Sequence, residues 1–177
     1  ERRHGGGDGT GTDAQLMAGA SGSPDNAPVA VARQFGEQVP HSRDLGMRVV
    51  AVEADQVRMR LAPQLWLLAD DDAEEICTSV LYSLADSAAG LAVFAASGEL
   101  TPIATLDLRM DYLRPAASDR ALLAQARCLH LTDDVAFVHC DVLSEGREQP
   151  VATGKATFMR NTRGKRFQAA GEGDNSA

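Results

Sequence analysis

The stretch from Val80 to Ala95 has the hydrophobic spacing of an amphipathic helix. Apolar residues recur every three or four positions and form one stripe, which comprises Val80, Leu81, Leu84, Ala88, Leu91, Ala92 and Ala95. Ser97-Gly98 follows, and glycine commonly ends a helix because it adopts the left-handed conformation without strain. The pattern predicts a long helix over Cys77–Ala96 with one face in a hydrophobic core.

Alternating apolar and polar residues predict strands on both sides of this helix. The clearest is Ile103–Leu113, where one face carries Ala104, Leu106, Leu108, Met110 and Tyr112, and the other carries Thr105, Asp107, Arg109 and Asp111. Upstream we expect a short helix over Val29–Gln38, ending before Pro40, and then a hairpin of Met47–Glu53 and Gln56–Leu61. Downstream strands are expected at Ala121–Leu131, Val135–Leu143 and Pro150–Met159.

One long helix followed by an antiparallel meander predicts an α+β fold, with an antiparallel sheet wrapped around one long central helix. Residues 27–160 carry this pattern. Residues 1–26 are rich in Gly, Ser, Asp and Ala and are expected to form a disordered N-terminal tail, and residues 161–177 a polar C-terminal tail.

Composition narrows the classes of function. The chain has 177 residues, 44% of them hydrophobic, which is enough for one domain with a sizeable core. A formal charge of −8 argues against general nucleic-acid binding. No apolar run approaches the roughly 20 residues of a membrane span, so no membrane partner is expected. Cys77, Cys128 and Cys140 lack metal-site spacing and are expected to be reduced thiols in a cytoplasmic protein without a metal site.

Asp86 is the candidate for chemistry. It lies off the apolar stripe among mostly small residues, namely Ser79, Tyr82, Ser83, Ala89 and Gly90, with no Lys or Arg within one turn. Small side chains allow a ligand or another backbone to come close. The alternative is an ordinary solvated acid on a surface helix.

Three segments together resemble a known family. They are Leu-Ala-Asp-Ser-Ala at 84–88, Thr-Leu-Asp-Leu at 105–108 continuing to Tyr-Leu-Arg-Pro-Ala at 112–116, and Ala-Thr-Gly-Lys-Ala-Thr-Phe at 152–158. Their order and spacing, over roughly residues 45–160, resemble the hotdog-fold acyl-CoA thioesterases of the phenylacetate-pathway type.

The resemblance implies a hotdog fold and hydrolysis of an acyl- or aryl-CoA thioester to the free acid and coenzyme A. Asp86 would be the catalytic carboxylate, and Thr105 a hydroxyl that helps to place the water. Active sites of this family lie at a homodimer interface, so a homodimer or a dimer of dimers is implied. No cofactor is expected beyond the coenzyme A of the substrate. Asp86 could act as a general base or attack the thioester itself.

The chain departs from the family where the helix begins. The family usually has His-Gly-Gly there, and this chain has Cys77-Thr78-Ser79. Unpaired N–H groups at a helix N-terminus can hold an oxyanion, and Thr78 and Ser79 are expected to supply them or merely to cap the helix. Because their side chains can crowd the acyl group, a non-catalytic acyl-CoA-binding hotdog dimer is the alternative function.

The sequence offers several further candidate residues for binding or catalysis. Arg114 and Arg160 are expected to contact the phosphates of coenzyme A, which need local positive charge on an acidic protein. Cys77 is either a nucleophile with a lowered pKa or an inert thiol. His139 and Cys140 are expected on opposite faces of one strand. The paired histidine and acid of hotdog dehydratases is not visible in the sequence.

Overall fold

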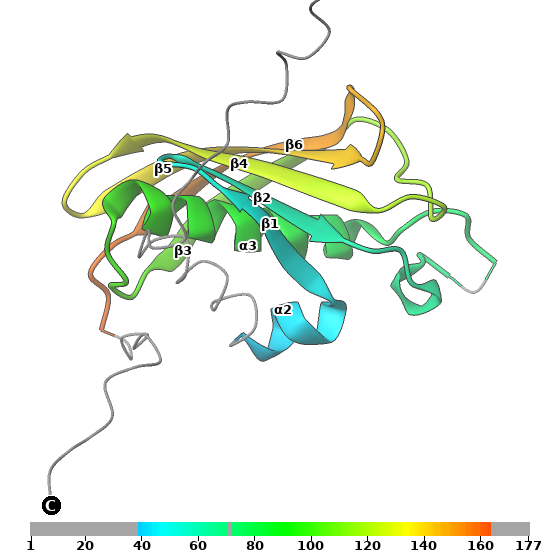
Figure 1. The fold of residues 1–177 in the computed structure, drawn as a ribbon, viewed down its shortest axis with the longest axis horizontal. Helices are drawn as coiled ribbons and strands as arrows, with labels where there is room; N and C mark the ends of the chain where they lie inside the picture. The colour runs from blue at the N-terminus through cyan, green and yellow to red at the C-terminus, as the bar shows by residue number, and fades with distance from the viewer. Residues whose placement is uncertain (1–38, 71, 164–177) are drawn as a thin grey trace, which may run out of the picture.

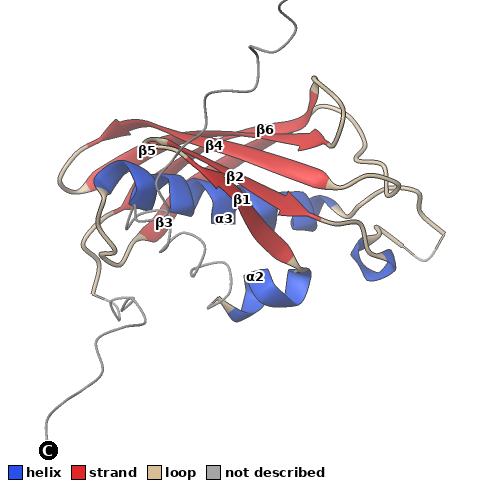
Figure 2. Cartoon of the chain, in the orientation of Figure 1, coloured by secondary structure: helices blue, strands red, loops and turns tan. Residues whose placement is uncertain are grey.

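The computed structural model describes residues 39–70 and 72–163, and within them the predicted elements form close to their expected bounds (Figure 2). The elements in chain order are α2 (Pro40–Leu45), β1 (Met47–Val52), β2 (Gln56–Leu61), the 3-10 turn η1 (Leu65–Leu67), α3 (Thr78–Ser97), β3 (Ala104–Tyr112), β4 (Leu122–Leu131), β5 (Val135–Ser144) and β6 (Pro150–Met159). The helix expected over 29–38 and the N-terminal tail lie outside the described residues, as does the C-terminal tail beyond residue 163.

The six strands form one antiparallel sheet in the order β1-β2-β4-β5-β6-β3. The sheet curves over α3, which lies along its concave face (Figure 1). The predicted α+β architecture, a sheet wrapped around one central helix, is therefore confirmed. The helix precedes β3 in sequence, but β3 joins the sheet at its far edge, beside β6.

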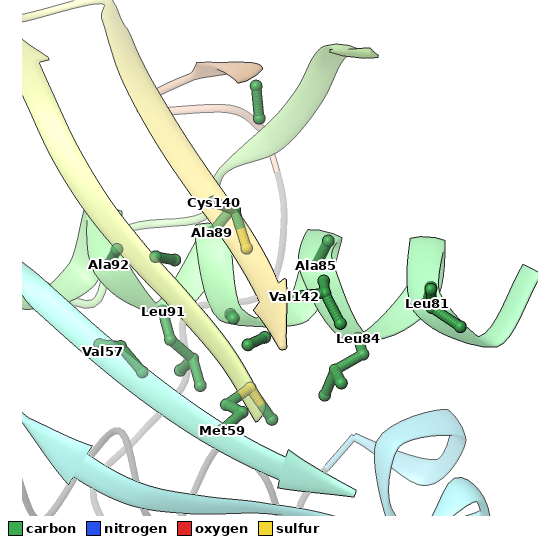
Figure 3. Close-up of a cluster of buried hydrophobic side chains, with 14 of the residues drawn as sticks. Val57, Met59, Leu81, Leu84, Ala85, Ala89, Leu91, Ala92, Cys140 and Val142 are labelled. Atoms are coloured by element: carbon green, nitrogen blue, oxygen red, sulfur yellow. The ribbon is translucent and has the colours of Figure 1, made fainter. Parts of the chain in front are cut away.

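Every residue of the predicted apolar stripe of α3 is buried, and the stripe packs on the inner faces of β2, β4 and β5. Figure 3 shows Leu84 and Leu91 of α3 among Val57 and Met59 of β2. Leu84 and Leu91 are both fully buried, and each such side chain contributes about 1.5–3 kcal/mol to stability.

By length and composition alone, α3 could cross a membrane, contrary to the expectation from apolar runs in the sequence. Most of the helix is buried inside the protein. Ala85, Ala89 and Val93 lie off the predicted stripe and are buried as well, because the sheet curves far enough to cover more than one face. Packing in the core thus accounts for the apolar character of α3.

Helix α2 is an element that sequence reasoning missed. Pro40 was expected to follow a helix and instead begins one, at a position where proline is tolerated because the N–H has no helical acceptor anyway. Gly46 ends α2 with a left-handed φ of 77°, and Gln64 Nε2 donates to the carbonyl of Leu45 at 3.0 Å. Ser42 is buried, so α2 is anchored to the body of the fold.

Strand β3 contains a β-bulge that the alternation in its sequence conceals. Thr105 lies opposite Phe158 and Asp107 lies opposite Thr157, so Leu106 is an extra residue without a partner on β6. Phe158 and Ala156 are buried, and their partners Thr105 and Leu108 share the face toward α3. The prediction that Thr105 and Leu108 lie on opposite faces is therefore wrong. Leu106, expected in the core, is 52% exposed.

Gly90, in the middle of α3, leaves room for a methyl group. An added Cβ would lie 3.6 Å from Ile103 Cδ1 and 3.8 Å from Phe158 Cε1, which are ordinary van der Waals contacts. We expect Gly90→Ala to stabilise the protein by about 1 kcal/mol, measured by urea unfolding. The matched control is Gly154→Ala in β6, where an added Cβ would clash with Met110 Sδ and approach the Arg109 carbonyl oxygen to 3.0 Å. That change should destabilise the protein, and equal effects of the two alanines would contradict the packing described.

Candidate active site

Asp86 projects from the face of α3 opposite the apolar stripe and is half-buried. Thr105 Oγ1 donates a hydrogen bond of 2.9 Å to Asp86 Oδ1. The bulge at Leu106 makes this contact possible, because it turns Thr105 toward the helix. Among the described residues, Thr105 is the only side chain with a hydrogen bond to Asp86. The structure thus brings together the two residues that the sequence analysis paired.

The N-terminus of α3 is arranged differently from the expectation. Cys77 is the N-cap residue and makes no side-chain capping bond, so the interpretation of Thr78 and Ser79 as caps is wrong. Both residues lie in the first turn and are exposed. Cys77 Sγ lies 3.1 Å from Ser79 Oγ, and hydrogen bonds from the hydroxyl and backbone N–H of Ser79 lower the pKa of the Cys77 thiol. The first N–H groups of a helix have no acceptor within it, so this end of α3 offers donors.

Two tyrosines that sequence reasoning missed hold β3 against the first half of α3. Tyr82 Oη donates to the carbonyl of Leu108 at 3.2 Å, and Tyr112 Oη donates to the carbonyl of Thr78 at 3.4 Å. Burial raises the pKa of Tyr112. The two tyrosine contacts join residues 26 and 34 positions apart, so no local pattern in the sequence indicated them.

Within one chain, the helix N-terminus and Asp86 are too far apart to act on one carbonyl group. Thr78 and Asp86 are eight positions apart, which corresponds to about 12 Å along the helix axis. A donor to the carbonyl oxygen must lie about 3 Å from it, and a general base must lie within hydrogen-bond reach of the attacking water. A single chain therefore presents either the carboxylate or the helix N-terminus to a substrate, and not both.

His41 of α2 reaches the same face of α3. Its Nε2 lies 3.3 Å from Ser83 Oγ, and Ser83 lies one turn before Asp86. On a helix of 3.6 residues per turn, Ser83 is offset by about 60° to one side of Asp86 and Tyr82 by about 40° to the other. Tyr82 contacts Leu108 of β3 and Ser83 contacts His41 of α2, so these two contacts lie on either side of Asp86 around the helix. The structure thus places a histidine in contact with the serine one turn before the acid, a contact that the sequence did not indicate.

The two arginines expected at the phosphates of coenzyme A lie at opposite ends of β6. Arg114 donates to the carbonyl of Pro150, at the start of β6, whereas Arg160 follows its end, about 30 Å away. Arg160 Nη2 lies 3.5 Å from Glu99 Oε2, its Nη1 donates to the carbonyl of Thr132, and its side chain is only 10% exposed. The two arginines therefore lie too far apart within one chain to bind the same phosphates. The contacts of Arg160 with Glu99 and Thr132 give it a structural role.

Arg114 instead lines a groove of about 710 Å³ together with Arg120 and Arg147. The groove lies where the segment after β3 meets the β5–β6 turn. Asp119 and Glu148 also line it, so three positive charges face two negative ones. Arg114 is two residues from Tyr112, which bonds to Thr78, so the groove lies close to the N-terminal end of α3.

The other candidates are separate from this region. Cys128 and Cys140 are buried free thiols, and burial raises the pKa of Cys140 to about 12. His139 lies on the outer face of the sheet, with Nε2 3.3 Å from Asp141 Oδ2, so it points away from buried Cys140 as predicted. Within residues 39–70 and 72–163, no three His, Cys, Asp or Glu side chains converge as a metal site.

Comparison with known proteins agrees with the fold. Residues 78–151 match the family model described as the thioesterase superfamily. The matched segment runs from the start of α3 to the start of β6 and includes Asp86, Thr105 and Arg114.

Solved structures similar to the chain include two phenylacetic acid degradation proteins and a thioesterase. A mutant of the phenylacetic acid degradation protein PaaI from Thermus thermophilus is 29% identical, with a TM-score of 0.60 over 68% of this chain and 98% of that chain. PaaI from the phenylacetic acid degradation operon of E. coli is 17% identical, with a TM-score of 0.69 over 78% and 96%. A thioesterase from Haemophilus influenzae is 18% identical, with a TM-score of 0.64 over 72% and 85%. No curated protein sequence matches significantly. The hotdog fold and the likeness to phenylacetate-pathway thioesterases are thereby confirmed.

Proposed function

We propose that this protein hydrolyses an acyl- or aryl-CoA thioester to the free acid and coenzyme A, with Asp86 as the general base. The observation that carries the proposal is the hydrogen bond from Thr105 to Asp86 inside a thioesterase-superfamily segment. Thr105 fixes one carboxylate oxygen, which leaves the other to accept a proton.

In the proposed reaction, Asp86 takes a proton from water as the water oxygen bonds to the thioester carbonyl carbon. The carbonyl electron pair moves to its oxygen, where N–H groups at a helix N-terminus stabilise the negative charge. The carbon–sulfur bond then breaks, and the departing thiolate takes the proton from Asp86. Direct attack by Asp86 would instead form an anhydride. Label in the Asp86 carboxylate after a single turnover in ¹⁸O-labelled water would establish the anhydride, because water that attacks its Asp86 carbonyl leaves the label on the enzyme.

Two copies of the chain are needed for this reaction, given the distance of about 12 Å between Thr78 and Asp86. Strand β3 is an edge strand that carries exposed Leu106 and is followed by exposed Leu113. Pairing of two β3 strands about a two-fold axis would cover this edge and bring Asp86 of one copy near the helix N-terminus of the other. We therefore propose a homodimer, or a dimer of dimers, with shared active sites.

The groove lined by Arg114, Arg120 and Arg147 is the proposed contact for the phosphates of coenzyme A. Its three arginines outnumber its two acids, which gives a local excess of positive charge on a protein of net charge −8. One guanidinium group can also bind two phosphate oxygens at once. Its position near the N-terminal end of α3 allows the phosphates and the thioester to belong to one bound molecule. Arg160 is not part of this proposed phosphate contact, because its side chain is bound to Glu99 and to the carbonyl of Thr132.

The test of the proposed function is release of free thiol from a panel of aliphatic and aromatic acyl-CoA thioesters. Turnover that depends on Asp86 would support hydrolysis. The replacement of His-Gly-Gly by Cys77-Thr78-Ser79 favours one alternative, a non-catalytic acyl-CoA-binding dimer. Saturable binding of acyl-CoA without any thiol release would establish that alternative instead.

Restoring glycine at the helix start tests whether the two hydroxyl side chains narrow the site. We expect Thr78→Gly with Ser79→Gly to raise turnover or to broaden the range of acyl groups, because both residues are exposed at the end that offers N–H donors. The cost is up to about 1 kcal/mol per glycine in helix stability. A folded double variant without turnover, beside an active parent, would contradict this account and make the hydroxyls themselves catalytic.

A further inference from the structure

The contact between His41 and Ser83 has no evident need in the fold. His41 is exposed, and α2 is already held by buried Ser42, by Leu45 and by the bond from Gln64. The contact nevertheless joins residues 42 positions apart and lies on the face of α3 that carries Asp86. An ordered polar contact beside a candidate catalytic acid points to a role in the reaction.

Ser83 and Asp86 are spaced to hold one water molecule between them. Residues three apart on a helix have Cβ atoms about 5–6 Å apart. A water that hydrogen-bonds to two oxygen atoms at about 2.8 Å each can bridge a gap of that order. Thr105 holds Asp86 Oδ1 from β3, and Oδ2 has no side-chain hydrogen-bond partner among the described residues, so it is available to a water held also by Ser83.

We propose that Ser83 holds the attacking water together with Asp86, and that His41 is a positioning residue which orients the Ser83 hydroxyl. This inference rests on the proposed hydrolysis. With His41 Nε2 unprotonated, the Ser83 hydroxyl donates its hydrogen to the ring and keeps its oxygen lone pairs for the water. The water then donates one hydrogen to Asp86, which removes it, and the other to Ser83 Oγ. Its lone pair is left to bond to the thioester carbon.

The experiment measures kcat and KM for the full chain with the best acyl-CoA substrate. We expect Ser83→Ala to lower kcat about tenfold with little change in KM, because a group that holds only water contributes to the transition state and not to substrate binding. Ser83→Thr keeps the hydroxyl and should retain most of the activity. Ser87→Ala is the matched control, since Ser87 is another half-buried serine of α3 that points about 100° away from Asp86.

His41 is tested in the same way. His41→Ala should lower kcat several-fold, and His41→Gln should restore much of it, because a glutamine side chain places an acceptor near the position of Nε2. His41→Ala added to Ser83→Ala should have no further effect, since His41 acts only through Ser83. His130→Ala, at an exposed histidine on the outer face, is the control.

Each result decides between defined explanations. Unchanged kcat in Ser83→Ala, with an active wild type that still depends on Asp86, would overturn the inference and leave the proposed function intact. A rise in KM alone would make Ser83 part of the acyl pocket and would also overturn it. A wild type without thiol release would overturn both proposals. Hydration of an enoyl-CoA that is lost in His41→Ala would replace them with a dehydratase-type reaction.

Discussion

Asp86→Asn should lower turnover at least about a hundredfold, the low end of what a general acid–base group contributes. Asparagine keeps the size of the side chain and can still accept the hydrogen bond from Thr105, so the fold and the local geometry should persist. It cannot take a proton from water at neutral pH. Thiol release under saturating acyl-CoA measures the effect, and size-exclusion chromatography checks that the assembly is unchanged.

The matched control is Asp107→Asn, because Asp107 is an exposed acid two residues from Thr105 on the same strand. It removes the same charge without reaching the Asp86 carboxylate. Equal losses in the two variants would mean that overall negative charge matters rather than the Asp86 carboxylate. Near-normal turnover in Asp86→Asn would end the assignment of this residue as the base.

The wild-type chain should be a dimer or a dimer of dimers by light scattering at micromolar concentration. Replacing Leu106 and Leu113 by lysine should raise the dimer dissociation constant at least about a hundredfold. The two side chains are 52% and 50% exposed on the single chain, and each leucine buried in an interface contributes about 1.5–3 kcal/mol. Each dimer loses four such leucine contacts and gains four positive charges along the β3 edge, where the two copies must pair.

Turnover should fall as the dimer dissociates, because the proposed site takes its carboxylate and its N–H donors from different copies. Leu129→Lys is the control, since Leu129 is 59% exposed but lies on β4, which β5 and β6 separate from β3. A wild type that is monomeric and fully active would contradict the shared site. Dissociation caused equally by the Leu129 variant would place the interface elsewhere.

The core of the fold was predictable from local patterns. The apolar stripe of α3 and the strands β2 and β6 follow from periodicities of 3.6 and 2 residues, and these come from the covalent geometry of helices and strands. Asp86 was recognisable because an acid among mostly small residues interrupts such a pattern without a nearby cation to explain it. These features depend on residues only a few positions apart, so a single sequence is enough to predict them.

The surroundings of Asp86 depended on tertiary structure. The bulge at Leu106 reverses the alternation of β3 and turns Thr105 toward the helix, yet the bulge exists only in the register between β3 and β6. His41 reaches Ser83 because α2 begins at Pro40 and packs against β1, whereas the sequence predicted only a helix that ends before Pro40.

The amino-acid sequence by itself determined the central helix, most strands of the sheet and the acid on that helix. Tertiary structure decided which side chains face the acid, where the arginines gather and which strand is left at the edge. The physical reason is that periodicity reports which face of an element is apolar, whereas register and the packing of distant segments decide what that element meets. A shift of one residue in β3 would turn Thr105 away from Asp86 and leave the sequence pattern unchanged.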